Sequence, residues 1–322
     1  MLRRKVQAYL PLAVFGLAGC PGTDRDLTVA GRDAEAPPSE TAPPLPVDPV
    51  AFKLLNWNVN NFFNDRLDSP ELIPGAETLV TAQEYADKLA AIQAVLEKHS
   101  ADVIVLQEVE NQNVTTDLAN ALGTYPYTTT SAGNDPRGID IAVLSRYPID
   151  KTVSHKREFF YSVTDPNRTF TFARDCLEAH FTVNGRHLVL LGIHFKAKAD
   201  AESQLKRLAE AEHTRSIASQ LLTSDPAMTV YVLGDFNDQP GSAPLMALEG
   251  SGATALSSAA AWAPLEQRYS VTYLGNPELI DDQLGSSATK EWLETGVVSI
   301  DHSSAVDLAS DHAPVVATYN VR

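Results

Sequence analysis

A chain of 322 residues and 34.8 kDa can form one large α/β domain or two smaller ones, and its 44% hydrophobic and 20% charged residues are globular proportions. This composition excludes a wholly disordered chain, a fibrous repeat and a multi-span membrane protein. The formal net charge of −16 excludes long-range attraction to nucleic acid or anionic lipid, so an anionic substrate must be bound locally, by a metal ion or a few basic groups.

The first twenty residues have the charge order of an export signal. Three basic residues at positions 3–5 precede a mostly apolar stretch from Ala8 to Ala18, which is too short to cross a bilayer as a helix. The stretch ends in Leu17-Ala18-Gly19-Cys20, which resembles a bacterial lipobox. The resemblance implies a lipoprotein signal peptide over residues 1–20, a lipid on Cys20, and a location at the bacterial cell envelope, outside the cytoplasm. The alternative is an ordinary signal peptide with a chance cysteine.

Residues 21–50 are typical of a tether. They contain seven prolines and almost no aliphatic periodicity, which favours an extended, solvated and disordered chain. The tether would hold the folded part away from the membrane. If Cys20 is lipidated, Cys176 has no partner for an intrachain disulfide, and we expect it to be a small packing residue because no activating base lies near it in the sequence.

From residue 51 to residue 322 the pattern predicts one α/β domain. Val-, Ile- and Leu-rich runs predict strands at Lys53–Val59, Val103–Glu108, Ile139–Ser145, Leu188–Phe195, Thr229–Asn237 and Ala313–Tyr319. Helical periodicity predicts helices at Gln83–His99 and Ala201–Leu222, the second with Asp200 as N-cap. Phe170–Val183 alternates as a strand does, and Asn184-Gly185 predicts a hairpin turn into Leu188. Hairpins mixed with helical crossovers indicate mixed sheets.

Polar side chains follow the apolar runs repeatedly, at the point where each predicted strand ends. Glu108, His194 and the pair Asp235 and Asn237 end three strands; Asn58 and Asn60 end another, and Asp311-His312 precedes the last. Polar groups at the ends of buried strands are the usual construction of an α/β active site. Each one alone is more often a turn cap or a hydrogen-bonded structural residue, so only their occurrence together indicates an active site.

The types of side chain at these positions indicate which metal ion they would bind. Carboxylates and amides without thiolates indicate Mg²⁺ or Mn²⁺ rather than zinc or copper. The sequence has no nucleophile elbow, phosphate-binding P-loop, HExxH helix or GxGxxG turn after a strand.

Seven short motifs, in this order, resemble the endonuclease/exonuclease/phosphatase superfamily, which has the deoxyribonuclease-I-like fold. They are Asn56–Asn60, Leu106–Glu108, Gly138–Ser145, Gly192–Phe195, Gly234–Asp238, Leu279–Asp281 and Ser310–His312. The match covers essentially all of residues 52–320. It implies a four-layer α/β/β/α sandwich of two mixed β-sheets flanked by helices.

The resemblance also implies roles for residues at the motif positions. Glu108 would be the principal metal ligand, with Asn58 and Asp311 completing an oxygen-rich surround. The catalytic residues would be His194, Asp235, Asn237, Asp281 and His312, with Asp235 orienting or deprotonating the attacking water and Asp281 fixing the His312 tautomer.

Basic and polar residues beside the motifs are candidates for binding substrate phosphate. These are Asn60, Arg137, Arg174 and Lys196, although Lys196, Arg137 and Arg174 are equally consistent with solvated surface roles. Two departures from the family pattern matter. Asp282-Gln283 follows Asp281 where the family often has an aromatic residue or His and then an aliphatic one, and a second pair, Asp301-His302, precedes Asp311-His312. We prefer the later pair because an apolar strand follows it.

The leading hypothesis is therefore a metal-dependent phosphodiesterase, a nuclease in particular, that acts as a lipid-anchored monomer. No basic stripe interleaved with aromatic residues follows a strand, so sequence-specific recognition of nucleic acid is not expected. The alternatives are a phosphatase that acts on phosphomonoesters, a phospholipid-directed phosphodiesterase of the same fold, and a catalytically inactive binding module. An inactive module should have lost at least one of the motif residues, and none is lost.

Overall fold

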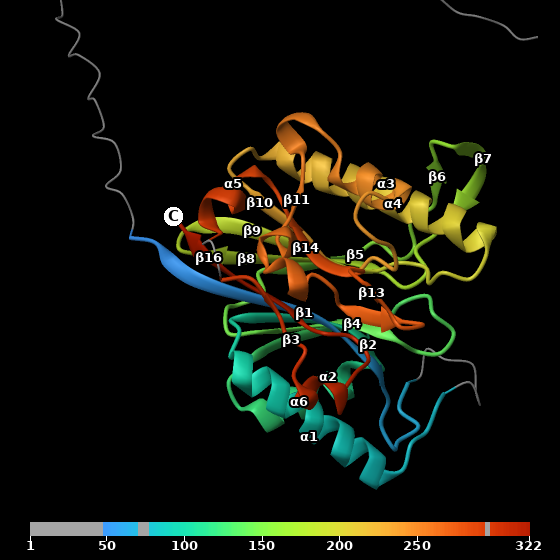
Figure 1. Ribbon diagram of the computed structural model, residues 1–322, viewed down its shortest axis with the longest axis vertical. Helices are drawn as coiled ribbons and strands as arrows, with labels where there is room; N and C mark the ends of the chain where they lie inside the picture. Colours follow the sequence, from blue (N-terminus) through green and yellow to red (C-terminus); the bar gives the residue numbers. More distant parts are fainter. Residues whose placement is uncertain (1–47, 70–76, 294–296) are drawn as a thin grey trace, which may run out of the picture. The chain divides into compact units, whose positions relative to one another are not determined.

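Two mixed β-sheets lie face to face, and helices cover both outer faces (Figure 1). The computed structural model describes residues 48–69, 77–293 and 297–322. In spatial order the first sheet contains β15 (Ser299–Ile300), β16 (Val315–Val321), β1 (Val50–Phe62), β2 (Val103–Val109), β4 (Asp140–Ser145) and β3 (Tyr127–Ser131). The second contains β11 (Ser257–Ser258), β14 (Asp281–Gly285), β10 (Thr229–Asp235), β9 (Arg186–His194), β8 (Cys176–Val183) and β5 (Lys151–Ser154).

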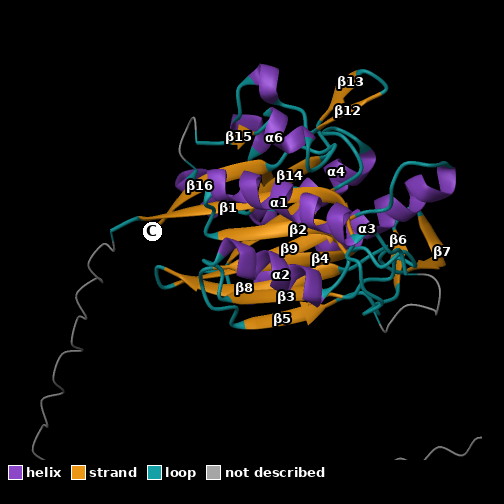
Figure 2. Cartoon of the chain, turned by 90° about the horizontal axis from the view of Figure 1, so that it is seen from below, coloured by secondary structure: helices purple, strands orange, loops and turns teal. Residues whose placement is uncertain are grey.

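Helices and two small hairpins complete the domain. The helices are α1 (Ala82–His99), α2 (Gln112–Leu122), α3 (Ala201–Ser224), α4 (Ala243–Glu249), α5 (Ser287–Trp292) and α6 (Ser304–Asp307). The hairpins pair β6 (Phe160–Ser162) with β7 (Asp165–Phe170) and β12 (Val271–Tyr273) with β13 (Asn276–Glu278). Figure 2 shows both hairpins at the margin of the sheets.

The alternation of side chains along the strands builds three apolar layers. Residues such as Leu54, Val105 and Leu190 point between the two sheets and form the central core. Their neighbours Leu55 and Ile104 face α1, and Val189 faces α3 in the same way. The predicted four-layer α/β/β/α sandwich is therefore confirmed.

Both predicted helices form. Helix α1 begins after Thr81, which makes a reciprocal capping box with Glu84, and helix α3 begins after Asp200, whose carboxylate accepts from Ser203 N at 2.8 Å. Cys176 is completely buried beneath α3, as expected of a packing residue.

The predicted strand Phe170–Val183 is wrong in its first part, over residues 171–175, and correct from Cys176 to Val183. Strand β7 ends at Phe170 and β8 begins at Cys176, and the segment between them turns to form its own bonds. Asp175 accepts from His155 N at 2.9 Å and from the Ser131 hydroxyl. The predicted turn at Asn184-Gly185 does form, with left-handed φ of 50° and 73°.

A chain of hydrogen-bonded imidazoles and carboxylates joins the edge of the second sheet to α3. His155 Nδ1 lies 2.7 Å from Glu158 and His155 Nε2 lies 3.1 Å from Glu178, while His213 extends the chain on Glu158 and His180 extends it on Glu178. Both nitrogens of His155 face carboxylates, an arrangement that favours the imidazolium form. Burial lowers its pKa, but the two carboxylates outweigh burial and raise the pKa above its usual value.

The predicted signal peptide, Cys20 and the predicted tether as far as residue 47 lie outside the described residues. Strand β1 begins at Val50, the last residue assigned to the tether. Across the described ranges we find no helix with the length and apolar character needed to span a bilayer.

Candidate active site

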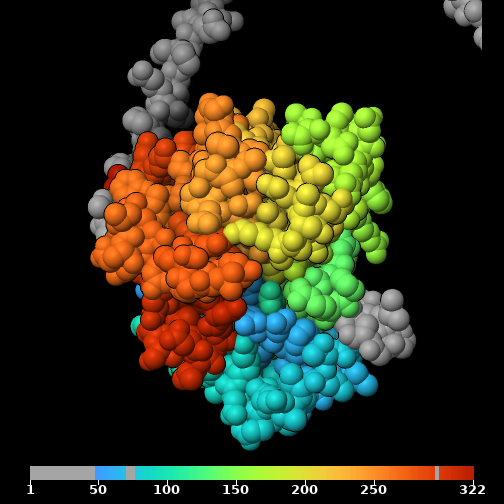
Figure 3. All heavy atoms as spheres, turned by 45° about the vertical axis from the view of Figure 1, so that its right-hand side comes forward, coloured from blue at the N-terminus to red at the C-terminus, as the bar shows by residue number. Residues whose placement is uncertain are grey.

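Polar side chains from both sheets converge where β1, β2, β9 and β10 end. Strands β1 and β2 are parallel, with Asn58 opposite Gln107, and β9 and β10 are parallel, with His194 opposite Asp235. Figure 3 shows a hollow on this side, between segments of the first sheet in blue and teal and segments of the second in orange and yellow.

Backbone bulges aim Glu108 into this hollow. The ladders of β2 shift register between Gln107 and Val109, and Glu108 itself has a left-handed φ of 66°. A bulge lifts a side chain out of the ladder, and a non-glycine residue in this conformation costs about 1–3 kcal/mol, which surrounding contacts must offset. One such contact is the Asn61 N–H, which donates to Glu108 Oε2 at 2.9 Å.

Asn58 links the two sheets. Its Nδ2 donates to Glu108 Oε1 at 3.3 Å and to Asp235 Oδ2 at 3.1 Å, and its Oδ1 accepts from Asn60 N at 2.9 Å. Asn60 and Asn61 have left-handed φ of 51° and 56°, and they form a bulge in β1 before it pairs with β2 again at Phe62. Asn60 therefore contributes a bulge to the site, and its side-chain oxygen accepts from Asn61 Nδ2 at 2.8 Å.

Asp235 lies at the buried end of β10, and the chain turns sharply after it. Gly234 has φ 140°, and a Cβ there would lie 2.0 Å from Ile193 O, so no other residue fits. Asn237 has φ 51° and donates its N–H to Asp235 Oδ1 at 2.7 Å and its Nδ2 to Phe195 O at 3.0 Å. The Asp235–Asn237 spacing is thus a turn rather than two residues of one extended strand, although both reach the site.

His194 lies between the carboxylates. Its Nε2 is 3.4 Å from Asp235 Oδ2 and 3.8 Å from Glu108 Oε1. Burial, with the positive charges of Arg174 and His312, holds the pKa of His194 well below its usual value, so this imidazole is neutral.

Asp281 and His312 form a buried pair. His312 Nδ1 lies 2.8 Å from Asp281 Oδ2, and Asp281 has no exposed surface. The next residue, Asp282, points the other way and binds Ser258 and the Ala260 N–H. Asp301 also lies elsewhere, against Lys98 and His99. The structure thus places Asp281 and the later Asp-His pair together.

The pKa values of His312 and Asp235 lie far above their usual values. Burial lowers the pKa of His312, but the Asp281 carboxylate, with Asp235 and Asp311, outweighs it and raises the pKa to about 10. Burial and the neighbouring Asp281 raise the pKa of Asp235 to about 7. The site therefore holds one imidazolium and one carboxyl that titrates near neutrality.

The predicted basic residues Arg137 and Arg174 lie near His194, and Lys196 follows His194 by two residues. Arg174 is buried, donates Nη1 to Phe195 O at 3.0 Å, and lies with its Nε 3.1 Å from Asp135. Asp135 also accepts from Arg137 Nε at 3.0 Å, so one carboxylate orients both guanidinium groups. Lys196 is half-buried, and its backbone N–H donates to Glu210. Asp311 is exposed and lines a pocket together with His312 and Asn237.

Sequence reasoning gave no role to three residues that hold the site together. Lys88, on α1, donates to the carbonyl oxygens of Asn60, at 2.9 Å, and Ala309, and so joins the end of β1 to the loop before His312. Ser310 Oγ donates to Asn58 O at 2.7 Å and accepts from the His312 N–H. Ser270 Oγ accepts from the Asp281 N–H at 3.0 Å. The position of Ser310 directly before Asp311-His312 was the only available signal.

The residues present suit a hard divalent cation. Asp235, Asp281 and His312 each offer a ligand atom within 4.8 Å of the others. Asp281 Oδ1 and His194 Nδ1 are buried without a hydrogen-bond partner among the described residues, so donors remain for a bound ion or water. Oxygen-rich donor sets of this kind bind Mg²⁺ or Mn²⁺.

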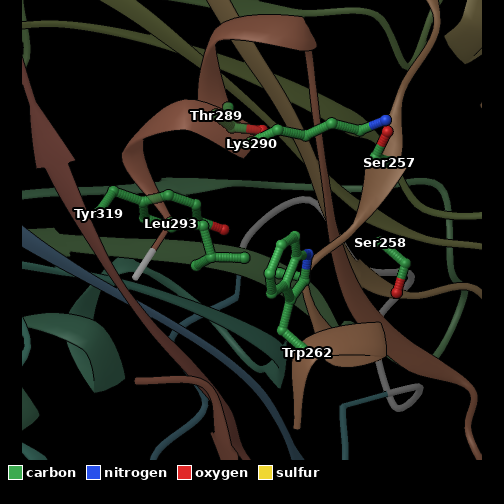
Figure 4. A pocket seen from close by; sticks show the side chains of 8 residues that line it. Ser257, Ser258, Trp262, Thr289, Lys290, Leu293 and Tyr319 are labelled. Atoms are coloured by element: carbon green, nitrogen blue, oxygen red, sulfur yellow. The ribbon is translucent and has the colours of Figure 1, made fainter. Parts of the chain in front are cut away.

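Two other features lie apart from this site. Asp68, Glu77 and Glu110 form a second acidic group, in which Asn111 and Asn113 donate to Asp68. A small pocket between α5, β11 and β16 is lined by Trp262, Leu293 and Tyr319, and it contains none of the predicted site residues (Figure 4).

Comparisons with known proteins agree with this arrangement. Residues 53–292 match the model of the endonuclease/exonuclease/phosphatase family. A comparison with curated proteins gives no match.

Solved structures share the fold at low identity. A family protein from Bacteroides thetaiotaomicron has TM-score 0.61 and 16% identity, over 86% of this chain and 97% of its own. The human Nocturnin catalytic domain with bound sulfate has TM-score 0.61 and 15% identity, over 84% and 95%. A truncated TDP2 from Caenorhabditis elegans has TM-score 0.58 and 15% identity, over 84% and 98%.

Proposed function

Because the chain belongs to the endonuclease/exonuclease/phosphatase family of metal-dependent phosphoric ester hydrolases, we propose that it hydrolyses phosphodiesters of nucleic acid without sequence specificity. The observation that supports a diester best is a pair of pockets, of about 390 and 230 Å³, that share Val271 and Thr272 of β12 in their linings. Asp311 and His312 line both of them. A phosphate at His312 would thus have room for a substituent on each side, and a diester has two substituents where a monoester has one.

Glu108 and Asn58 would hold the divalent ion, with Asp235 and Asp281 close by and Asp311 adding negative charge at the rim. When bound, Mg²⁺ or Mn²⁺ neutralises charge on the phosphoryl oxygens as it builds up.

The protein groups would then move two protons. Asp235 would orient the attacking water and take its proton, since a base with a pKa of about 7 is well matched to neutral solution. The water oxygen bonds to phosphorus as the bond to the leaving oxygen breaks, and His312, held as an imidazolium by Asp281, gives that oxygen a proton. Asn237 and neutral His194 would donate hydrogen bonds to phosphate oxygens.

A substrate panel tests this proposal. The purified protein is incubated with DNA, RNA, phosphomonoesters, phosphoinositides and sphingomyelin, with Mg²⁺, with Mn²⁺ or with EDTA, and the His312→Ala variant serves as the control. We expect metal-dependent cleavage of nucleic acid that the variant loses. Turnover of monoesters or phospholipids alone would assign the site to a phosphatase or a phospholipid diesterase, and no turnover at all would favour an inactive binding module.

We also propose that the enzyme acts as a lipid-anchored monomer at the bacterial cell envelope, on the strength of Leu17-Ala18-Gly19-Cys20 after a short apolar run. Stable attachment needs two acyl chains, which a lipobox cysteine would carry. Cys20→Ser should abolish lipid labelling and release the protein from membranes. Unlabelled wild type, with unchanged fractionation of the variant, would reject the anchor.

A further inference from the structure

One wall of the smaller of the two pockets consists of residues that have no role in the proposed reaction. Its lining includes Val271, Tyr273 and Ile280, which belong to the β12–β13 hairpin or the segment that follows it. In Figure 2 this hairpin projects from the body of the domain. Tyr273 is 61% exposed and Leu274, at the tip, is 84% exposed.

The hairpin is held as a fixed wall. Its turn, Leu274-Gly275, has left-handed φ of 50° and 83°, the conformation of a tight two-residue hairpin turn. Glu278 at the end of β13 forms an ion pair with Lys198, which lies in the segment after β9. This pair lies in the lining of the pocket and neutralises the Lys198 ammonium, so the charge that remains is that of Asp311 and His312 on the side of the reacting centre.

The opposite side of the pocket is the reacting centre. Asn237, Asp311 and His312 line it together with the hairpin residues. A group that occupies the pocket therefore lies beside a phosphate bound at His312, at the distance of a substituent carried on that phosphate through a sugar. The occupant is a substituent of the phosphodiester itself rather than a separate ligand.

The size and lining of the pocket favour a single ring system. A volume of about 230 Å³ is below the roughly 300–1,000 Å³ of pockets for drug-sized ligands, and it is small for lipid acyl chains. On the wall away from Asp311 and His312, an exposed tyrosine beside aliphatic side chains is a surface on which a flat base stacks. Stacking of this kind does not depend on sequence, which agrees with the absence of a basic recognition stripe.

We propose that this pocket is the subsite for the nucleobase next to the scissile phosphate, and that Tyr273 is the residue that stacks on it. The inference rests on the proposed nuclease function and adds to it a residue that sets specificity. Tyr273 touches the substrate away from the reacting atoms, so its loss should weaken the use of base-bearing substrates and leave the chemistry intact.

The test compares a short oligonucleotide with the same oligonucleotide made abasic on either side of the scissile phosphate. Tyr273→Ala should lower kcat/KM for the base-bearing substrate about 5- to 150-fold, the usual range for one lost stack, and leave the abasic substrate unchanged. Tyr273→Phe should retain wild-type preference. The matched control is Tyr161→Ala, since Tyr161 is 60% exposed on the other hairpin and should affect neither substrate.

A binding measurement in EDTA tests the nucleobase subsite separately from the nuclease function. Metal-free wild type should bind a nucleoside monophosphate more tightly than abasic ribose phosphate, and Tyr273→Ala should remove that difference. The subsite is wrong, while the nuclease function stands, if wild type binds and cleaves base-bearing and abasic substrates alike. The same conclusion follows if Tyr273→Ala affects both substrates equally. If wild type cleaves no nucleic acid in the panel, the nuclease proposal fails and this subsite fails with it.

Discussion

Removing the His312 imidazole should destabilise the protein by an amount that depends strongly on pH. Asp281 is fully buried, one of its oxygens has no partner among the described residues, and the other faces His312 Nδ1 at 2.8 Å. His312→Ala therefore leaves a buried carboxylate unpaired, which costs about 3–5 kcal/mol in typical cases. The carboxyl can avoid the charged part of this penalty by taking up a proton, so the cost of protonation limits that part.

That limit gives the magnitude. With an ordinary Asp pKa near 3.9 and about 1.4 kcal/mol per pH unit, protonation costs about 4 kcal/mol at pH 7 and about 1.5 kcal/mol at pH 5. The double variant Asp281→Asn, His312→Ala has no carboxylate to bury, so at pH 7 it should be more stable than His312→Ala alone. Denaturant unfolding at the two pH values measures all three proteins.

Activity should show the same coupling. Each single substitution should lower kcat/KM about 10²–10⁴-fold, and the double variant should be scarcely worse than His312→Ala, because the two groups act as a unit. Two results would contradict this coupling. One is that the effects of the two single substitutions on kcat/KM multiply in the double variant. The other is that the double variant is no more stable than His312→Ala at pH 7.

Three further predictions concern the surroundings of the site and the edge of the second sheet. Glu108→Gln should weaken Mg²⁺ or Mn²⁺ binding at least about tenfold in calorimetry, since it removes a ligand charge; equal affinity would exclude Glu108 as a ligand. Lys88→Met should lower kcat about 10- to 100-fold by loosening two loops of the site, whereas Lys88→Arg should keep most activity. Lys53→Met is the matched control, because that ammonium also donates to a backbone carbonyl, at 2.9 Å, but away from the site; equal losses in Lys53→Met would contradict a local role for Lys88. The His155–Glu178 pair should stabilise the fold most between about pH 4.5 and 6.5. Hydrogen bonds from His155 and His180 outweigh burial and lower the pKa of Glu178, so its contribution is lost as pH falls; the raised pKa of His155 means that its contribution is lost as pH rises. Thermal unfolding of wild type and Glu178→Gln from pH 4 to 9 checks this, and a constant difference would count against it.

The order of the apolar runs was enough to predict the layers and the strand ends that carry the site. Glu108, His194 and Asp235 each follow a run of residues that a sheet buries, and parallel pairing then brings their ends together. Only the family motif selected Asp281 over Asp282, because alternate residues face opposite sides and the register is set by pairing with β10.

The backbone irregularities that aim the side chains were not predictable. Left-handed conformations at Asn60, Glu108 and Asn237 arise where a strand leaves its ladder, and that depends on neighbouring strands rather than on local sequence. Lys88 was missed for a related reason. A lysine on a helix is ordinarily solvated, and nothing local shows that two backbone carbonyls from distant segments will lie within its reach.

The site is divided between the two sheets, and this division has a consequence for how the enzyme comes to be active. Asn58 and Glu108 arrive with one sheet, and Asp235 and Asp281 arrive with the other. A nascent or refolding chain in which a single sheet has formed holds two of these four residues and none of their cross-sheet contacts. Hydrolysis should therefore begin in one late step, when the sheets dock and Tyr231 packs against Tyr319. A cell that makes this hydrolase is thereby spared active folding intermediates that could cut its own phosphodiesters.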